Sequence, residues 1–235
     1  MEQPRPPLSV VMPVLDEARG VVAALARLQS LRACGVEVIV VDGGSADGTA
    51  LLAAPWCDRL LEAPRGRSAQ MNAGAAAARG EVLVFLHADT VLPADALAAV
   101  AGGLERSGRA WGRFDVAIAP ATPLLALVAV LMNARSRATG IATGDQAIFA
   151  RRTAFERAGG FPAIPLMEDV ALSRALKRQS PPLCLRERAV TSARRWERNG
   201  TLRTIVLMWR LRLAYALGAD PRHLAQRYDV ERTST

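Results

Sequence analysis

The sequence is poor in cysteine and in aromatic residues, and each scarcity excludes a class of protein. Its three cysteines, Cys34, Cys57 and Cys184, are widely spaced and contain no CxxC pair. A disulfide framework and a zinc site are therefore both excluded, and a reducing, cytoplasmic location is predicted. Aromatic residues make up only 5% of the chain, and no RNP, KH or helix-turn-helix pattern occurs. We therefore expect no nucleic-acid partner.

Lysine is almost absent, although the chain is strongly basic. Lys177 is the single lysine, so the net charge of +8 comes almost wholly from arginine. Part of this excess is a composition bias, and the rest indicates an anionic partner. A diphosphate, an acidic lipid surface and nucleic acid all have the required charge, so local motifs must choose among them.

Long apolar runs are also missing. The first residues lack the basic segment and apolar run of a signal peptide, so none is predicted. The longest uncharged stretch, residues 116–132, contains Pro120 and Pro123. It falls short of the roughly 20 apolar residues that cross a bilayer. We interpret it as a strand, a turn and a buried or interfacial helix.

The first two-thirds of the chain alternates short β-rich runs with alanine-rich helical stretches. This alternation is typical of an α/β fold with a doubly wound, mostly parallel sheet and crossover helices. With 235 residues, of which 51% are hydrophobic, the chain is expected to form one domain. The predicted strands are 8–13, 36–42, 59–62 and 82–86, and the predicted helices are 16–30 and 68–80, the second ended by Gly80.

The second half continues with less regular elements. We predict helices over 94–102, 168–177 and 201–217, strands over 111–118 and 183–190, and a strand that enters a helix over 146–152. Residues 1–92 are assigned to a nucleotide-binding half, 93–200 to an acceptor half, 201–218 to a C-terminal helix, and 229–235 to a loose tail.

Polar residues follow three of the predicted strands at the point where each strand stops. They are Pro13–Glu17, Asp42–Thr49 and His87–Asp89. Ligands of an open α/β sheet bind beyond the carboxyl ends of its strands, so the three segments are predicted to line one cleft. Asp42 is favoured for binding a base or ribose over capping a helix, whereas Asp47 is favoured as a helix cap.

Asp89 ends a buried strand, where a carboxylate is costly unless it meets a cation or hydrogen-bond donors. A metal would meet that need. Mg²⁺ or Mn²⁺ binds through few protein carboxylates while sharing substrate diphosphate oxygens. His87 lies on the same side of an extended chain, and it is either a second ligand, which suits Mn²⁺, or a hydrogen-bonded pocket histidine.

Glu168 and Asp169 occupy a predicted helix start after a turn-rich segment. Capping of the helix and catalysis are equally good interpretations of this pair. Four arginines near glycine or aromatic neighbours could make bidentate contacts with a diphosphate, although most arginines in such a chain face water. These four are Arg65, Arg67, Arg194 and Arg195.

Taken in order, seven motifs resemble those of family 2 glycosyltransferases with the GT-A fold. They are VVMPVLDE, VVDGGSADGT, GRSAQMNAG, FLHADT, GDQAIF, MED and RRW. The resemblance covers residues 8 to about 218 and is strongest to small bacterial enzymes called radical-SAM/selenodomain-associated family 2 transferases. Dolichol-phosphate mannose synthases are more distant relatives.

The resemblance assigns roles to individual residues. It implies that Asp169 is the catalytic base beside Glu168, and that Asp89 is the metal-binding aspartate of a DxD motif whose first position is His87. It implies nucleotide binding by Pro13, Val14, Glu17, Asp42, Arg67 and Ala88, and an acceptor side made of Gly144, Asp145, Gln146, Arg195 and Trp196. Ser192 replaces the glutamine of the QxxRW element found in processive members, so transfer of a single sugar is expected.

The implied activity is metal-dependent, inverting transfer of a sugar from a nucleoside-diphosphate sugar to an acceptor hydroxyl. Mn²⁺ or Mg²⁺ is the expected cofactor, and a UDP-sugar is favoured over a GDP-sugar. Two other classes stay open: a sugar-nucleotide nucleotidyltransferase, whose glycine-rich loop and lysine are missing, and a non-catalytic basic membrane-peripheral module.

The acceptor is open, with a lipid-linked one as one possibility. Residues 124–132 and the arginine-studded helix 201–217 would suit such an acceptor, or a protein associated with the cytoplasmic face of a membrane. Ordinary core packing is the preferred interpretation of both helices.

Overall fold

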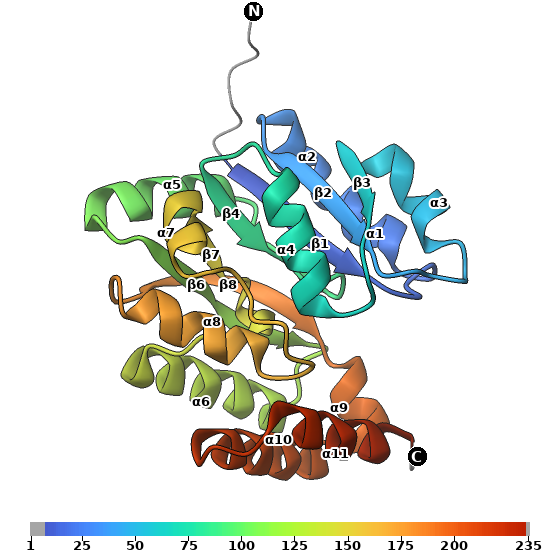
Figure 1. The fold of residues 1–235 in the computed structure, drawn as a ribbon, viewed down its shortest axis with the longest axis vertical. Coiled ribbons are helices and arrows are strands. Elements are labelled where there is room, and N and C mark those ends of the chain that lie inside the picture. The colour runs from blue at the N-terminus through green and yellow to red at the C-terminus, as the bar shows by residue number, and fades with distance from the viewer. Residues whose placement is uncertain (1–7, 234–235) are drawn as a thin grey trace, which may run out of the picture.

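The computed structural model describes residues 8–233 and contains one eight-stranded sheet with helices on both faces (Figure 1). The strand order is β3-β2-β1-β4-β7-β6-β8-β5. Of the seven neighbouring pairs, β1–β2, β1–β4, β2–β3 and β6–β8 are parallel, and the three that involve β7 or β5 are antiparallel. The predicted α/β, mostly parallel sheet is confirmed.

The strands of the first half are those predicted from the sequence, within a residue or two at their ends. They are β1 (Leu8–Val14), β2 (Glu37–Asp42), β3 (Arg59–Glu62) and β4 (Val82–Phe85). β1, β2 and β4 are almost wholly buried, because helices cover both faces of the sheet and leave their apolar runs no contact with water.

The helices of the first half differ more from the prediction. The stretch expected to be one helix over 16–30 forms a turn followed by α1 (Val21–Ala26) and α2 (Gln29–Ala33), and Asp16 has a positive φ of 51°. The acidic pair at 16–17 therefore shapes a loop instead of starting a helix. Next come α3 (Thr49–Ala53), the short 3₁₀ helix η1 (Ala54–Trp56) and α4 (Arg67–Ala77), which ends three residues before Gly80.

Alternating side chains of the strands build two cores, one on each face of the sheet. Val10, Val38 and Val84 face α1 and α5, whereas Val11, Ile39 and Leu83 face α4, α7 and α8. This is the period-two pattern of a buried strand.

In the second half, the strand and helix predictions hold apart from element ends. The strands are β5 (Thr90–Val91), β6 (Trp111–Ala119), β7 (Phe149–Arg151) and β8 (Leu183–Ser192). The helices are α5 (Ala96–Ser107), α6 (Pro123–Thr139), η2 (Gly144–Gln146), α7 (Arg152–Arg157) and α8 (Glu168–Lys177). α5 runs past its predicted end at Gly102 and stops at Gly108, whose left-handed φ of 64° ends helices readily.

Three C-terminal helices gather at one end of the molecule, below α6 and α8 in Figure 1. They are α9 (Arg194–Asn199), α10 (Thr201–Ala216) and α11 (Pro221–Thr233). α10 matches the predicted helix. α11 was not predicted, and it includes residues 229–233, for which a loose tail was expected; residues 234 and 235 lie outside the described part of the chain. Leu211 and Leu224 join these helices to Met167 and Val170 at the start of α8.

The apolar stretch 116–132 contains the end of β6, a turn and the first part of α6, as predicted. Within residues 8–233, no helix has the length and apolar character that a membrane span requires. The expectation of ordinary packing is wrong for one side of each helix, because α6 and α10 expose large apolar side chains. These are Leu124, Leu127, Val130 and Leu131 in α6 and Leu202, Val206, Trp209 and Leu213 in α10.

Candidate active site

A cavity of about 390 Å³ opens at the carboxyl ends of β1 and β4, where the sequence predicted a ligand cleft. Its walls come from five parts of the chain: the end of β1 with the loop after it, the start of α4, the segment after β4, the residues before α8, and α11. Its lining comprises Pro13, Val14, Leu15, Glu17, Arg65, Gly66, Arg67, Gln70, His87, Ala88, Asp89, Pro165, Leu166, Ala225 and Tyr228. Six of the predicted nucleotide and metal residues, together with His87, therefore share one cavity.

The loops after β1 and β2 hold each other in place through side-chain to backbone hydrogen bonds. Asp16 accepts from the Ala46 amide at 2.9 Å, and its own amide donates to Ser45 Oγ at 2.9 Å. The Glu17 amide donates to Thr49 Oγ1 at 2.8 Å. Asp47 accepts from the Ala18 amide at 2.9 Å and from the Thr49 amide at 3.0 Å. Asp47 thus accepts from the first residue of α3 and ties α3 to the first loop, although the N-cap position itself is Gly48 and has no side-chain cap.

Asp42 lies next to this cavity but is not among its lining residues. It is buried, and its Oδ2 accepts hydrogen bonds from the Gly44 and Ser45 amides at 3.0 and 2.8 Å. Oδ1 accepts from the Ser45 hydroxyl. These bonds fix the glycine-rich turn, so Asp42 has a structural role in addition to the nucleotide contact that the resemblance implies.

Gln70 of α4 belongs to the site and was missed in the sequence. It is buried, and its Nε2 donates to the carbonyl oxygens of Val14 and Val41, each at 2.8 Å. These carbonyls lie at the ends of β1 and β2, so Gln70 fixes the floor of the cavity to α4. Gly43 fits against it because a Cβ there would approach the Gln70 amide to 3.0 Å. The GRSAQMN motif pointed to this helix, but no periodicity singles out its glutamine.

His87 connects the donor cavity to the segment 144–146. Its Nδ1 lies 3.5 Å from Asp145 Oδ1, and its ring packs against Gly144. A Cβ at Gly144 would come within 2.3 Å of the His87 ring, so only glycine fits there. The structure thus brings His87 into contact with Gly144 and Asp145, which lie more than 50 residues after it in the sequence.

Asp89 lines the same cavity with its carboxylate partly exposed. Its backbone carbonyl accepts from the Ser192 amide at 3.0 Å, which holds the turn between β4 and β5 against the end of β8. Its Oδ1 accepts only a long hydrogen bond, of 3.4 Å, from Thr90 Oγ1. The carboxylate therefore keeps lone pairs available for a cation at the cavity.

The residues around Asp89 fit a metal that shares its coordination with substrate. Among the described residues, no cluster of three or more His, Cys, Asp and Glu side chains could form a metal centre. Mg²⁺ and Mn²⁺ do not need such a cluster when diphosphate oxygens and water complete the shell. Asp89 would supply one ligand, and His87 is the other candidate on this wall.

Asp169 is positioned by the segment 144–146 and by its own helix. Its Oδ2 accepts from the Gly144 amide at 2.9 Å, and its Oδ1 accepts from the Val170 amide at 2.7 Å. With Glu168, His87 and Gly144 it lines a small cavity next to the donor cavity, and His87 lines both. The predicted base thus reaches the region next to the donor site from the acceptor half of the fold.

Glu168 is buried in that small cavity, with a side chain only 7% exposed. Burial raises its pKa to about 7, and the neighbouring Asp169 carboxylate adds to the shift. The Arg67 guanidinium, 4.0 Å away, and His87 act in the opposite direction. A carboxyl group with a pKa near neutral is uncommon and often marks a functional site.

Basic groups surround the donor cavity. Arg65 and Arg67 line it from the start of α4, and the Arg67 side chain is about half exposed, so it is accessible to a ligand. Arg194 of α9 forms an ion pair with Glu17, with Nη2 and Oε1 3.1 Å apart. This pair connects the C-terminal helices to the loop after β1.

Ala225 and Tyr228 of α11 also line the donor cavity, although the sequence offered no reason to expect them there. Hydrophobic contacts that are distant in sequence bring α11 to this place, through Leu224 and the start of α8.

Three residues predicted for the acceptor side, Asp145, Gln146 and Trp196, do not line the cavities, and a fourth cannot be placed. Gln146 is fully buried: its Oε1 accepts from the Thr143 amide at 3.2 Å, and its Nε2 donates to Asn133 at 3.3 Å. Trp196 packs against the apolar cluster of Val116 and Ile118. The side chain of Arg195 lies outside the described part of the structure. Gln146 thus supports the segment that carries Gly144 and Asp145.

A family comparison matches residues 9–124 to "Glycosyl transferase family 2". No curated protein sequence matches the chain. The matched residues include the loops after β1 and β2, the start of α4, and both His87 and Asp89. The match favours sugar transfer over nucleotidyl transfer, which was the other enzymatic class left open by the sequence.

Solved structures agree on the fold. A mannosyltransferase from Pyrobaculum calidifontis in complex with GDP-Man and Mn²⁺ has a TM-score of 0.62 at 24% identity, over 80% of this chain and 57% of its own. TarS 1–349 of S. aureus in complex with UDP-GlcNAc has a TM-score of 0.64 at 16% identity, over 79% and 58%.

Glucosyl-3-phosphoglycerate synthase of Mycobacterium tuberculosis, in complex with Mn²⁺, UDP and phosphoglyceric acid, has a TM-score of 0.57 at 20% identity, over 77% and 68%. The alignments thus span somewhat more than half of the first two proteins and about two-thirds of the third. Residues 9–124 are similar to the family 2 glycosyltransferases, and the described chain has the fold of the solved glycosyltransferase structures.

Proposed function

We propose that the protein transfers one sugar from a nucleoside-diphosphate sugar to an acceptor hydroxyl, with inversion at the anomeric carbon and with the help of Mn²⁺ or Mg²⁺. The observation that carries this proposal is the placement of His87 between two cavities. One cavity contains Asp89, Arg65 and Arg67, and the other contains Asp169. A diphosphate would thus lie on one side of His87, in the cavity of about 390 Å³, and the proposed base on the other side, at a cavity of only about 10 Å³.

In this proposal the donor lies in the larger cavity. Pro13, Val14, Glu17 and Ala88 contact the nucleotide, and Arg65 and Arg67 face its diphosphate, since guanidinium groups bind phosphate oxygens in a bidentate manner. Asp89, with or without His87, holds the cation. When bound, a divalent cation supplies positive charge that stabilises the diphosphate leaving group.

Asp169 is the proposed base. It accepts the proton of the acceptor hydroxyl while that oxygen forms a bond to the anomeric carbon, and the bond from this carbon to the diphosphate oxygen breaks on the opposite face. The hydrogen bonds from the Gly144 and Val170 amides hold the Asp169 carboxylate in a fixed orientation for this step. Fixed donors and acceptors need no rearrangement during the reaction.

The proposed donor is a UDP-sugar, in line with the UDP and UDP-GlcNAc complexes of two similar proteins, although a third contains GDP-Man. Thermal shifts measured with a panel of UDP-, GDP- and dTDP-sugars, in the presence of Mn²⁺, Mg²⁺ or a chelator, would identify the nucleotide of the donor. Stabilisation by UDP-sugars that requires the cation and is lost in Asp89→Ala is the expected result. Stabilisation by GDP-sugars alone would contradict the UDP assignment, and stabilisation that persists in chelator would contradict the metal.

Replacement of Asp169 tests the base separately from donor binding. Asp169→Asn keeps the shape and the acceptance of the Gly144 hydrogen bond but removes the basic carboxylate. We expect donor-dependent transfer or donor hydrolysis to fall by at least about a hundredfold, as for loss of a general base, while the thermal shift with donor is retained. Normal turnover in Asp169→Asn, together with loss of turnover in Glu168→Gln, would assign the base to Glu168 instead.

A further inference from the structure

The exposed apolar side chains of α10 form one continuous stripe. Leu202, Val206, Trp209, Leu213 and Leu217 follow one another at spacings of three or four residues, which places them on one face of a helix. Their exposed fractions lie between 56% and 80%. The buried residues of α10, Thr204 and Leu211, lie on the other face. α10 therefore turns a full apolar face away from the rest of the described structure.

α6 repeats this arrangement beside α10. Leu124, Leu127, Val130 and Leu131 are 37% to 61% exposed, whereas Leu125, Val128 and Ala129 pack inward. Met132 of α6 and Ile205 of α10 pack on the same apolar cluster, so the two helices are neighbours. Figure 1 places both at one end of the molecule, at the other end from β3 and α3.

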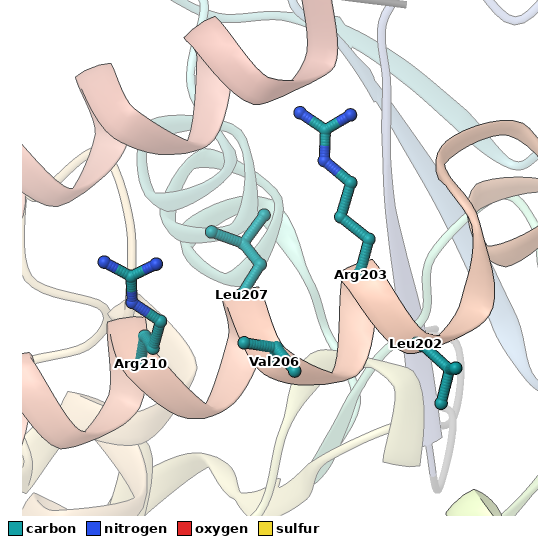
Figure 2. Close-up of a pocket in the computed structure, with 5 residues that line it drawn as sticks. All are labelled: Leu202, Arg203, Val206, Leu207 and Arg210. Atoms are coloured by element: carbon teal, nitrogen blue, oxygen red, sulfur yellow. The ribbon is translucent and has the colours of Figure 1, made fainter.

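Arginine is the only charged residue type in both helices. Residues 123–139 contain Arg135 and Arg137, residues 201–217 contain Arg203, Arg210 and Arg212, and neither stretch contains an acidic residue. In Figure 2, Arg203 and Arg210 extend from one side of α10 together with Leu207, while Leu202 and Val206 lie toward the other side. Their heads thus flank the apolar stripe instead of interrupting it.

A hollow of about 280 Å³ between α10 and α11 continues this surface. Apolar side chains of both helices line it, among them Leu213, Leu217 and Leu224, and its charged lining residues are Arg210 and Arg227. An apolar hollow with guanidinium groups at its wall fits an acyl chain whose headgroup carries a phosphate.

From these observations we propose that α6 and α10 dock on the surface of a membrane that contains anionic lipid. An interfacial helix combines a large apolar face, a Trp and basic side chains along its border, and it inserts to about 5–10 Å below the headgroups. Trp209, 70% exposed in the middle of the stripe, is the residue type enriched at that depth. Arg210, exposed at the border of the stripe, meets lipid phosphates, whereas Arg135 is largely buried and Arg137 is paired with Asp115.

A second copy of the chain is a poorer occupant of this surface. A symmetric pair would bring exposed arginines such as Arg210 together, and neither helix contains a carboxylate to compensate them. Arg137 is the exception, because Asp115 of β6 already pairs with it. Anionic lipid provides the missing negative charge together with an apolar phase. This inference does not depend on sugar transfer, because the apolar stripe lies outside the donor cavity. Only α11 contributes to both regions, with Ala225 and Tyr228 in the donor cavity and Leu224 and Arg227 in the hollow beside α10.

Vesicle flotation with purified full-length protein tests the proposal. We expect the protein to float with vesicles of phosphatidylcholine and phosphatidylglycerol at low salt, less so at high salt, and weakly with phosphatidylcholine alone. Trp209→Ser combined with Leu213→Ser should lower the partition coefficient about tenfold or more, because both side chains lose their apolar burial in lipid. Arg203→Gln with Arg210→Gln should lower it several-fold for anionic vesicles only.

Leu51→Ser is the matched control, because Leu51 of α3 is 81% exposed and belongs to a distant part of the fold. Its binding should equal that of the wild type. All variants alter exposed positions, and circular dichroism and donor thermal shifts would verify that they fold. Equal flotation of the wild type and the Trp209/Leu213 variant would overturn the proposal. So would a wild-type dimer, seen by light scattering, that this variant dissociates without any vesicle binding.

Discussion

Each end of the central sheet has a buried glutamate, and the two glutamates differ in how well neighbouring groups compensate their charge. At the amino end of β2, Glu37 accepts hydrogen bonds from the Arg79 amide at 2.8 Å, from Ser9 Oγ at 2.5 Å and from the Arg79 guanidinium at 3.0 Å. At the carboxyl end, Glu168 has Arg67 at 4.0 Å and Asp169 as its neighbour in the chain. Both residues are at most 5% exposed.

The pKa values of these glutamates move in opposite directions for that reason. Burial opposes ionisation of Glu37, but the hydrogen bonds from Arg79 and Ser9 outweigh burial and lower its pKa. Burial and the Asp169 charge raise the pKa of Glu168 to about 7. At the amino end of the sheet, hydrogen bonds thus compensate the charge of the buried carboxylate. At the carboxyl end, the ionised form of Glu168 is unfavourable, and we call this cost electrostatic strain. Such strain persists at functional sites, where a ligand or a proton transfer makes use of it.

The largest predicted effect concerns the compensated end. Glu37→Gln should destabilise the protein by about 3 kcal/mol at pH 7, because it weakens several charge-assisted hydrogen bonds at a buried position. The pKa of Glu37 is lowered in the folded state, so its contribution is present above the unfolded pKa and is lost as pH falls through the folded pKa.

Urea denaturation of the wild type and Glu37→Gln from pH 3 to pH 8 measures this effect. The difference between the two proteins should be full and constant above about pH 5 and should shrink as the pH falls below that value. Donor binding should be unchanged once the lower stability is taken into account, since Glu37 lies at the opposite end of the sheet from the cavity. A constant difference at all pH values would show that the carboxylate charge contributes nothing.

At the carboxyl end, Glu168→Gln should change the free energy of unfolding in the opposite direction to Glu37→Gln. In the folded state the pKa of Glu168 is raised to about 7 from 4.5, so between these values the folded protein binds more protons than the unfolded chain. Stability from this group is full below about pH 4.5 and is lost as pH rises toward 7. Glu168→Gln removes the penalty, and it should raise the free energy of unfolding at pH 8 by about 2–3 kcal/mol.

The same urea series, run in chelator, would measure this gain, which should vanish near pH 4. Glu37→Gln is its matched control, because a buried glutamate is replaced in the same way but the sign of the effect differs. A loss of stability in Glu168→Gln at pH 8 would mean that Arg67 and His87 compensate Glu168 fully. Lower transfer activity in the stabilised variant would indicate that Glu168 is retained for function at the expense of stability.

The contrast between the two ends also explains what could be predicted from the sequence. The strand runs, the turn residues and the acidic positions at strand ends are local, so β1, β2, β4 and the cavity wall with Asp89 followed from them. The turn at Asp16 and Glu17, where a helix start was predicted, did not, because tertiary hydrogen bonds to the loop after β2 override the helical pattern there. Local propensity is a weak guide where such contacts exist.

Residues that act through distant contacts were the hardest to predict. Gln70 reaches two strand ends across the core, and Tyr228 reaches the donor cavity through packing of α11 on α8. Neither position belongs to a pattern that periodicity or capping can reveal. Gln146 shows the opposite case, a residue in a recognisable motif whose side chain the fold uses for support. The exposed stripe of α10 looks like a core face in the sequence, because periodicity identifies a face but not what covers it.

The smallest predicted effect, that of Arg135→Met, comes from a comparison of two buried arginines, Arg113 and Arg135. Arg113, fully buried, has hydrogen bonds to Ser136, Asp115 and Asn133. Arg135 of α6 has buried Nε and Nη2 atoms without a hydrogen-bond partner. Burial lowers the pKa of Arg135 to about 10, and the nearby Arg212 charge contributes to that shift. One arginine is compensated and the other is not, which repeats the contrast between Glu37 and Glu168.

Arg135→Met keeps most of the side-chain volume and removes a charge that the surroundings do not satisfy. We expect it to raise the free energy of unfolding by about 1 kcal/mol. Arg113→Met should lower the free energy of unfolding by about 3 kcal/mol, because it leaves the hydrogen-bond partners of Arg113 buried and unpaired. Thermal denaturation at neutral pH measures both. A destabilised Arg135→Met protein would show that Arg135 has a compensating contact with Asp169, the carboxylate whose charge opposes the lowering of its pKa. Placement of the proposed base would then depend on α6 as well as on the Gly144 amide.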